Sequence, residues 1–217
     1  MYLNKIEQSY ISASLIVSPD DWKLPKLLEN PTDNTKLYLT FAKSSKLTSL
    51  FSWDNNTLVL AELGQKIVLL NHDKKLIEYF VQYEFSHFRK IKTITQIALW
   101  ANHAFPMPNL EGLSAIKWTF FKYLLPKADA IVADTMQTEL GKRFWLRRIR
   151  DAWDTGLKTY LVLRDTNMVF EIKNTKDLDT LTPYIWGTKD RHKYRRAFIT
   201  KKELFPKTTD IQTFLQK

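Results

Sequence analysis

Two clusters of basic side chains are the residues of this sequence best suited to chemistry, and that chemistry is the binding of phosphate. One cluster spans positions 189–196, where five of eight residues are Lys or Arg and Tyr194 lies among them. The other spans positions 142–150. Arg binds phosphate bidentately, and aromatic rings such as Tyr194 or Trp186 stack on bases. The predicted nucleic-acid-binding residues are Arg143, Arg147, Arg150, Arg191, Lys193, Arg195 and Arg196.

The net charge of the chain supports the same interpretation. Lys and Arg number 33 against 23 for Asp and Glu, which gives a formal net charge of +10 and a pI near 9.6. A surface of this charge attracts polyanions, so we expect nucleic acid or an acidic protein surface as the partner. The alternative for positions 189–196 is a solvated loop that only keeps the protein soluble.

Other kinds of catalytic and metal site are poorly represented. There is no cysteine, which excludes disulfides, thiolate zinc sites and cysteine nucleophiles. No Ser-His-Asp arrangement and no P-loop is present. The histidines have no i, i+4 spacing, so we expect no bound metal; they are His72, His87, His103 and His192.

A third pattern combines Asp165 with Glu171-Ile-Lys173. It resembles the PD-(D/E)XK nucleases, in which two carboxylates share a metal ion and a lysine assists hydrolysis. If residues 164–167 form a hairpin turn, however, Asp165 and Glu171 lie on the order of 10 Å apart at about 3.3 Å per residue. A Glu171–Lys173 pair on an exposed strand face is the simpler interpretation.

The chain is long enough, at 217 residues, for one sizeable core. With five glycines it contains little linker material, so we expect a single domain with regions at 1–35, 36–103, 104–173 and 174–217. Neither an apolar signal sequence at the start nor about 18 consecutive apolar residues elsewhere is present, so we expect no membrane contact and a cytoplasmic protein.

The first half of the chain predicts one helix and then an antiparallel sheet. Ser18 and Pro19 are typical of a helix start, and this helix should continue to about Leu28. β-rich runs follow, separated by the polar turns 54–56 and 71–73. The expected strands are 37–42, 47–53, 57–63, 66–70, 79–85 and 91–100.

The second half predicts alternating helices and strands, and one helix is amphipathic. Residues 112–125 form an apolar helix and residues 130–134 a short buried strand. Residues 138–155 form the clearest helix, with Gly156 as its C-terminal cap. One face of this helix is apolar, and the opposite face is basic, containing Lys142, Arg143, Arg147, Arg148 and Arg150.

The remaining elements are shorter. Strands are expected at 159–163, parallel to 130–134, and at 168–173, 185–187 and 196–200. Helical turns are expected at 177–181 and 210–216. Polar residues at 134–138 lie where a strand ends and a helix begins, a position that suits either a ligand or a simple helix cap on Asp134 or Thr135.

This order of elements resembles the GNAT family of acetyltransferases over residues 37–199. The resemblance implies an α+β fold with a mixed, mostly antiparallel central sheet and helices on both faces. It also implies a central strand that diverges from the next one, followed by a loop and helix N-terminus that bind the pyrophosphate of acetyl-coenzyme A. The segment Asp134-Thr135-x-Gln137-Thr138-x-x-Gly141-x-x-x-Trp145 also resembles bacteriophage proteins of this fold, which would place the protein in a bacterial host cytoplasm.

The resemblance implies specific site residues. The coenzyme loop of the family has the form Gln/Arg-x-x-Gly-x-Gly/Ala, and the matching segment here contains Asn109, Gly112 and Ser114. Acyl transfer also needs a base and an acid. The candidate catalytic residues are Glu78, Glu84 and Tyr160, with Trp145 where the family often has its tyrosine.

The resemblance thus implies an acyltransferase that uses acetyl-coenzyme A on a polyanionic or nucleic-acid-associated acceptor. The alternative is a non-catalytic nucleic-acid-binding or host-protein-binding protein on the same fold.

Overall fold

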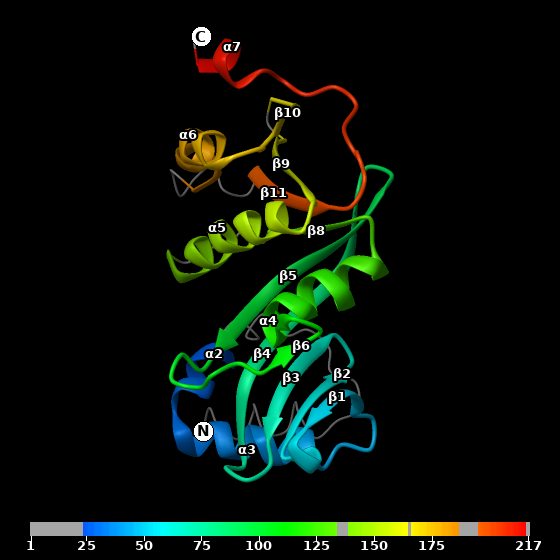
Figure 1. Cartoon of the computed structure of the whole chain (residues 1–217), viewed down its shortest axis with the longest axis vertical. Coiled ribbons are helices and arrows are strands. Elements are labelled where there is room, and N and C mark those ends of the chain that lie inside the picture. The colour runs from blue at the N-terminus through cyan, green and yellow to red at the C-terminus, as the bar shows by residue number, and fades with distance from the viewer. Residues whose placement is uncertain (1–23, 134–138, 165, 187–194, 216–217) are drawn as a thin grey trace, which may run out of the picture. The chain divides into compact units, whose positions relative to one another are not determined.

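The structure is a computed structural model that describes residues 24–133, 139–164, 166–186 and 195–215 (Figure 1). Residue contacts divide the described chain into two compact units. The first unit contains residues 24–83 and 97–107, and the second contains residues 84–96 and 108–215. The expectation of a single domain stays a prediction.

The first unit begins with the helices α2 (Leu24–Glu29) and α3 (Pro31–Ala42). Asn30 caps α3 by accepting hydrogen bonds from the Thr32 and Asp33 amides, and Pro31 suits the first helical position. The predicted strand at 37–42 is therefore wrong. Its apolar residues belong to a helical stripe of period three to four, which buries Asn34, Leu37, Tyr38 and Phe41. Ser18 lies outside the described residues.

Antiparallel strands form the rest of the first unit. They are β1 (Thr48–Trp53), β2 (Leu58–Leu63), β3 (Lys66–Asn71), β4 (Leu76–Phe88, as far as residue 83) and β5 (Ile91–Ala101, from residue 97), hydrogen-bonded in that order. The short helix η2 (Asp54–Asn56) turns the chain between β1 and β2 with all three residues at positive φ. A core of residues from α2, α3 and these strands includes Phe41, Val68, Leu70 and Phe80. These strand predictions are confirmed.

The second part of the second unit, from residue 108, starts with a small hairpin rather than a helix. β6 (Asn109–Leu110) pairs with β7 (Leu113–Ser114), and a helical segment follows as α4 (Ala115–Trp118), the π-helix η3 (Thr119–Leu124) and the 3-10 helix η4 (Leu125–Lys127). The sequence predicted a single helix at 112–125. The helix starts three residues later because Glu111 and Gly112 both have positive φ, 52° and 77°, as a two-residue hairpin turn requires.

The main sheet of the second unit has a chain order that differs from its spatial order. Its strands are β5, β8 (Ala130–Val132), β9 (Lys158–Leu163), β10 (Met168–Glu171) and β11 (Arg195–Thr200), arranged as β5-β8-β11-β9-β10. β5 and β8 pair in parallel through residues 93–95, whereas β11 lies antiparallel between β8 and β9. The expected common direction of β8 and β9 is confirmed.

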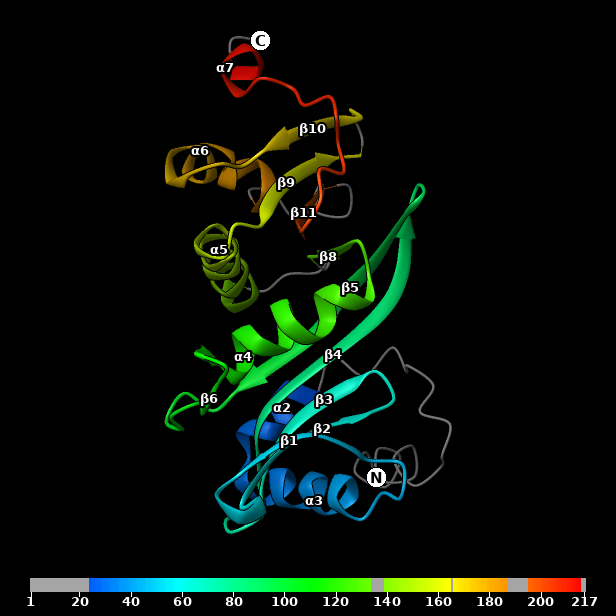
Figure 2. The same cartoon turned by 45° about the vertical axis from the view of Figure 1, so that its right-hand side comes forward.

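Helices cover one face of this sheet. α5 (Glu139–Asp154) and α6 (Thr175–Trp186) lie on one side of β9 and β10, whereas the segment that leads to α7 (Ile211–Leu215) passes on the other side (Figures 1 and 2). On that second side, Phe198, Phe205 and Tyr160 share an aromatic core. The strand predicted at 185–187 is wrong in its described part, since α6 continues through Trp186 despite Pro183.

The fold class is α+β, with a large, mixed and mostly antiparallel sheet and helices. Among the described residues, no helix combines the length and the apolar character needed to span a membrane.

The end of α5 provides a test of local backbone geometry. The Gly156 amide donates to the Trp153 carbonyl and the Leu157 amide to the Ala152 carbonyl, which is the Schellman arrangement, and Gly156 has φ +71°. We expect Gly156→Ala to lower the free energy of unfolding by about 1 kcal/mol, because alanine is strained at this φ even though a Cβ would meet nothing within 4 Å.

Urea unfolding followed by circular dichroism measures this loss. Gly156→Asn is the matched control, since asparagine tolerates the left-handed region better, and it should lose less stability. Equal stability of Gly156→Ala and the wild type would contradict the proposed role of the cap.

Candidate nucleic-acid interface

The orientation of α5 depends on a buried stripe of residues spaced three or four apart. Trp145, Ile149 and Ala152 are fully buried against the sheet. The Trp145 indole N–H also donates to the Gln96 Oε1 atom of β5 at 3.1 Å. A buried indole needs such a partner, so this bond fixes both the depth and the rotation of the helix.

The opposite side of α5 exposes three arginines. Arg143, Arg147 and Arg150 are all exposed and follow the spacing i, i+4, i+7, which places them on one side of a helix. We call these three residues the arginine face. Arg150 forms an ion pair with Asp179 of α6 at 3.7 Å, whereas both side chains remain solvated. The predicted exposure of these three residues is confirmed.

Arg148 does not belong to this face, and its prediction as an exposed basic residue is wrong. It is 4% exposed and pairs with Asp151 at 2.7 Å. Lys117 of α4 pairs with the same carboxylate at 2.5 Å. The Arg148 guanidinium also lies 5.1 Å from the Phe144 ring centroid. A buried charge needs such partners, so Arg148 packs within α5 instead of facing solvent. Asp151, which also pairs with Lys117, is the residue that joins α4 to α5.

The second predicted basic cluster is described only at its end. Arg191, Lys193 and the neighbouring Tyr194 lie outside the described residues. Arg195 and Arg196 begin β11 and are half-buried. The Arg195 Nη1 atom donates to the Tyr184 carbonyl at 2.6 Å, so this guanidinium fastens β11 to α6. The nucleic-acid role of these residues stays a prediction.

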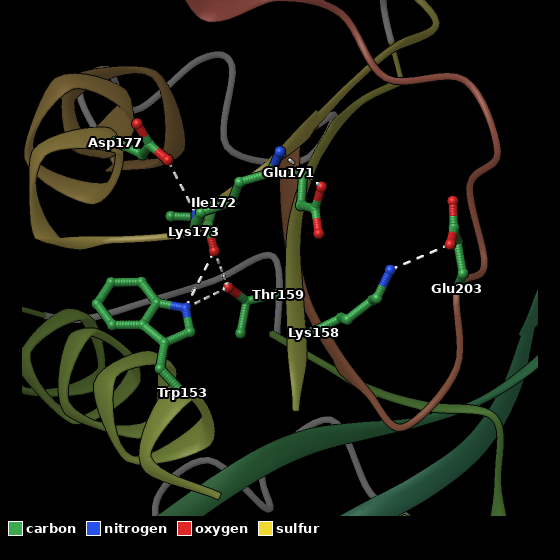
Figure 3. A network of polar contacts seen from close by, with 8 residues as sticks. All are labelled: Trp153, Lys158, Thr159, Glu171, Ile172, Lys173, Asp177 and Glu203. Atoms are coloured by element: carbon green, nitrogen blue, oxygen red, sulfur yellow. Dashed lines mark hydrogen bonds and ion pairs between the residues drawn. The ribbon is translucent and has the colours of Figure 1, made fainter. Parts of the chain in front are cut away.

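A set of hydrogen bonds at the end of α5 fixes the helix to the neighbouring hairpin (Figure 3). The Trp153 indole N–H donates to the Thr159 hydroxyl at 2.9 Å and to the Ile172 carbonyl at 3.0 Å. The Thr159 hydroxyl donates to the same carbonyl at 2.6 Å. On the opposite side of β9, Lys158 bonds Glu203 at 3.1 Å, which raises the pKa of Lys158 (Figure 3).

The predicted coenzyme loop is a closed hairpin turn. Asn109 and Glu111 are exposed, and Gly112 occupies the left-handed turn position. The Ala115 amide donates to the Pro108 carbonyl at 2.9 Å, and the Ser114 hydroxyl accepts from the Lys117 amide at 3.4 Å. Ser114 thus acts as the helix cap, and two amides of the helix start are already engaged.

The two predicted bases lie in different environments. Glu78 is 1% exposed and sits at an irregularity in the β3–β4 register, between Ile77 and Tyr79. Its carboxylate accepts hydrogen bonds from the side-chain Nδ2 atoms of Asn71 at 2.9 Å and of Asn102 at 2.7 Å. These bonds give Glu78 a role in holding β4 to its neighbours in the first unit. Glu84, in the second unit, is exposed on β4.

Tyr160 lies in the aromatic core and not at a surface. It is 1% exposed, and its ring packs edge-on against Phe205 with centroids 5.1 Å apart. Burial raises the pKa of Tyr160, the nearby Lys158 lowers it, and Glu171 and Glu203 raise it further. A raised pKa makes the phenol a weaker acid.

In the pattern that resembles the nucleases, Glu171 and Lys173 form the simple ion pair expected of an exposed strand. Lys173 pairs with Glu171 at 3.4 Å, and Asp165 lies outside the described residues. No group of three or more His, Asp or Glu side chains that could hold a metal occurs in the described part of the chain.

The histidines lie in separate places. His72 shares a 2.8 Å hydrogen bond with the Tyr38 hydroxyl, and His87 and His103 are exposed. The polar residues 134–138 and His192 are likewise outside the described ranges.

The structure reveals one basic site that the sequence interpretation missed. The turn between β4 and β5 carries Arg89 and Lys90, and the turn between β9 and β10 brings Arg164 to the same ring, that of Phe88. We call Arg89, Lys90 and Arg164 the turn cluster. The signal available in the sequence was the interleaving of aromatic and basic residues in 85–92, but nothing in it indicated that Arg164 would join them.

No protein-family model, curated protein or solved structure matches this chain. The interpretation of the site therefore depends on its geometry and charge alone.

The buried phenol of Tyr160 predicts a pH dependence of stability. Because its pKa is raised above the unfolded value of about 10, its contribution is complete below that pH and is lost as the pH rises through the raised pKa. We expect Tyr160→Phe to lose less stability between pH 8 and 10.5 than the wild type does, as measured by urea unfolding at both pH values.

Tyr184→Phe is the matched control, since Tyr184 is also a packed aromatic residue but is only half-buried. It should show the wild-type pH dependence. If Tyr160→Phe and Tyr184→Phe behaved alike, the alkaline loss of stability would have another origin.

Proposed function

We propose that this protein binds nucleic acid through the arginine face of α5. The observation that carries this proposal is the exposure of three arginines on one side of a helix whose opposite side is fully buried. Burial of Trp145, Ile149 and Ala152 fixes the rotation of the helix, so the arginine face always lies on the solvent side of α5. The net charge of +10 favours the approach of any polyanion.

The spacing of the arginine face suits a phosphate backbone. At about 1.5 Å per residue, Arg143 and Arg150 lie roughly 10 Å apart along the helix axis, which is comparable to a few successive phosphates. Each guanidinium offers a planar pair of donors to a phosphate. This regular row of bidentate donors favours nucleic acid over an acidic protein surface, whose carboxylates follow no fixed spacing.

The double variant Arg143→Gln/Arg147→Gln tests this function. We expect it to weaken binding to a 20-nucleotide single-stranded DNA or RNA by about tenfold at 0.1 M salt. The slope of log K against log salt should also fall by about 1.4, because two phosphate contacts are lost and each contributes about 0.7 with a single strand. Fluorescence anisotropy over a salt series measures both quantities.

Lys43→Gln/Lys75→Gln is the charge-matched control, since both lysines are exposed in the first unit. It removes the same charge and should bind almost as the wild type does. A wild type that binds neither oligonucleotide, or that binds poly-glutamate equally well, would refute the proposal.

A second candidate function is acyl transfer from acetyl-coenzyme A to a polyanionic or nucleic-acid-associated acceptor. The observation that favours it is the short parallel pairing of β5 with β8, which involves residues 93–95 of a strand that continues to Ala101. A strand of this kind is what the GNAT resemblance implies beside the coenzyme. The engaged amides near Gly112 and the buried positions of Glu78 and Tyr160 weigh against it, and Glu84 is the exposed candidate base.

Thermal unfolding with acetyl-coenzyme A tests the second candidate. At one hundred times the dissociation constant, a ligand stabilises a protein by about 2.7 kcal/mol, which raises Tm by roughly 5 °C. Adenosine diphosphate is the control, since it has a pyrophosphate without the thioester arm. An unchanged Tm at saturating acetyl-coenzyme A would contradict the enzymatic function.

A further inference from the structure

We infer that the turn cluster is a second phosphate-binding site, which holds the backbone of the same nucleic acid. This inference rests on the proposed function, but its residues are separate from the arginine face. Arg89 and Lys90 form the exposed turn between β4 and β5, and Arg164 is exposed at the end of β9. All three belong to the second unit.

Phe88 brings the two guanidinium groups together. The Cζ atoms of Arg89 and Arg164 lie 5.4 Å and 5.9 Å from the centroid of the Phe88 ring, so they are at most about 11 Å apart. Phe88 is half-buried and packs against the core, with its ring edge-on to that of Phe198 at a centroid distance of 5.2 Å. The side chain that positions the cations is therefore held by the sheet.

Arg89 has a second contact that fixes its direction. Its Nη2 atom donates to the Oδ1 atom of Asn167, which belongs to the turn between β9 and β10. Both Arg89 and Asn167 have positive φ, 56° and 57°, so two tight turns meet at this point. A guanidinium that is already ordered loses less conformational entropy when it binds an anion.

Among the residues that the structure describes, the turn cluster contains a local excess of positive charge. Within the described ranges, no ion pair joins a carboxylate to Arg89, Lys90 or Arg164. The carboxylate of Asp129 instead accepts from the Lys92 amide and lies 4.0 Å from Lys202. Like charges held this close repel each other, and a bound anion removes that repulsion.

The size of the cluster indicates the ligand. A separation of at most about 11 Å corresponds to no more than about three nucleotides of one strand at about 3.4 Å each. The site therefore fits consecutive phosphates of a single strand. Phe85, which is 42% exposed and lies 5.0 Å from Lys92 Nζ, adds an aromatic surface to the same hairpin.

The double variant Arg89→Gln/Arg164→Gln tests the inference with the same 20-nucleotide DNA and RNA probes. We expect about tenfold weaker binding at 0.1 M salt and a salt slope reduced by about 1.4. Asn167→Asp is a second variant that keeps both arginines and their packing on Phe88 but places a carboxylate beside Arg89. It should reduce the salt slope by about 0.7, the value for one contact with a single strand.

The outcomes separate the two proposals. If the arginine-face variant loses affinity while both turn variants match Lys43→Gln/Lys75→Gln, the turn cluster is not a phosphate site and the proposed function stands. If only the turn variants lose affinity, the turn cluster stands and the arginine face does not. A wild type that binds neither probe overturns both.

Discussion

The hydrogen bonds of the Trp153 indole N–H hold α5 in place in the second unit. One donor joins α5 to the Thr159 hydroxyl and to the Ile172 carbonyl, so the end of the helix, the start of β9 and the residue after β10 meet at one point. Each such bond contributes only about 1 kcal/mol net to stability. Its main effect is to fix the positions of three elements relative to one another. With the end of α5 fixed here and its middle fixed by Trp145 and Gln96, the helix can present only one side to solvent.

That constraint explains why neighbouring arginines have different roles. Arg147 and Arg148 are adjacent in sequence, yet one is exposed and the other is buried against Asp151 and Phe144. Rotation by about 100° per residue separates them. The proposed binding surface and a structural ion pair therefore come from the same short stretch of basic sequence.

Much of the second unit could be predicted from the sequence because its periodicity is strong. The stripe of Trp145, Ile149 and Ala152 and the glycine at 156 indicate a helix with defined ends, and most strands follow from alternation and polar turns.

Residues 37–42 of the first unit were predicted wrongly because Leu, Tyr and Phe suit a strand, while the helical stripe includes a polar residue, Asn34. Its side chain is buried because it bonds the Leu28 and Ile77 carbonyls, a contact that local sequence does not contain.

The candidate sites were harder to predict, because they too depend on contacts between residues far apart in the sequence. Exposure of Arg143, Arg147 and Arg150 follows from local periodicity, whereas the inward turn of Arg148 depends on Asp151 and Lys117. The turn cluster depends on two turns more than 70 residues apart meeting at Phe88. Glu78 has the residue type of a base, but its burial between two asparagines is a tertiary property.

The position of β11 has a consequence for how the protein is made. β11 lies between β8 and β9, although it follows both of them in the chain by more than 30 residues. During synthesis β8 and β9 leave the ribosome before the strand that joins them, and each has an unpaired edge until residues 195–200 arrive. Long-range strand pairing of this kind folds slowly and exposes edges that associate with other chains. The nascent second unit is therefore most prone to associate with other chains until translation has passed β11.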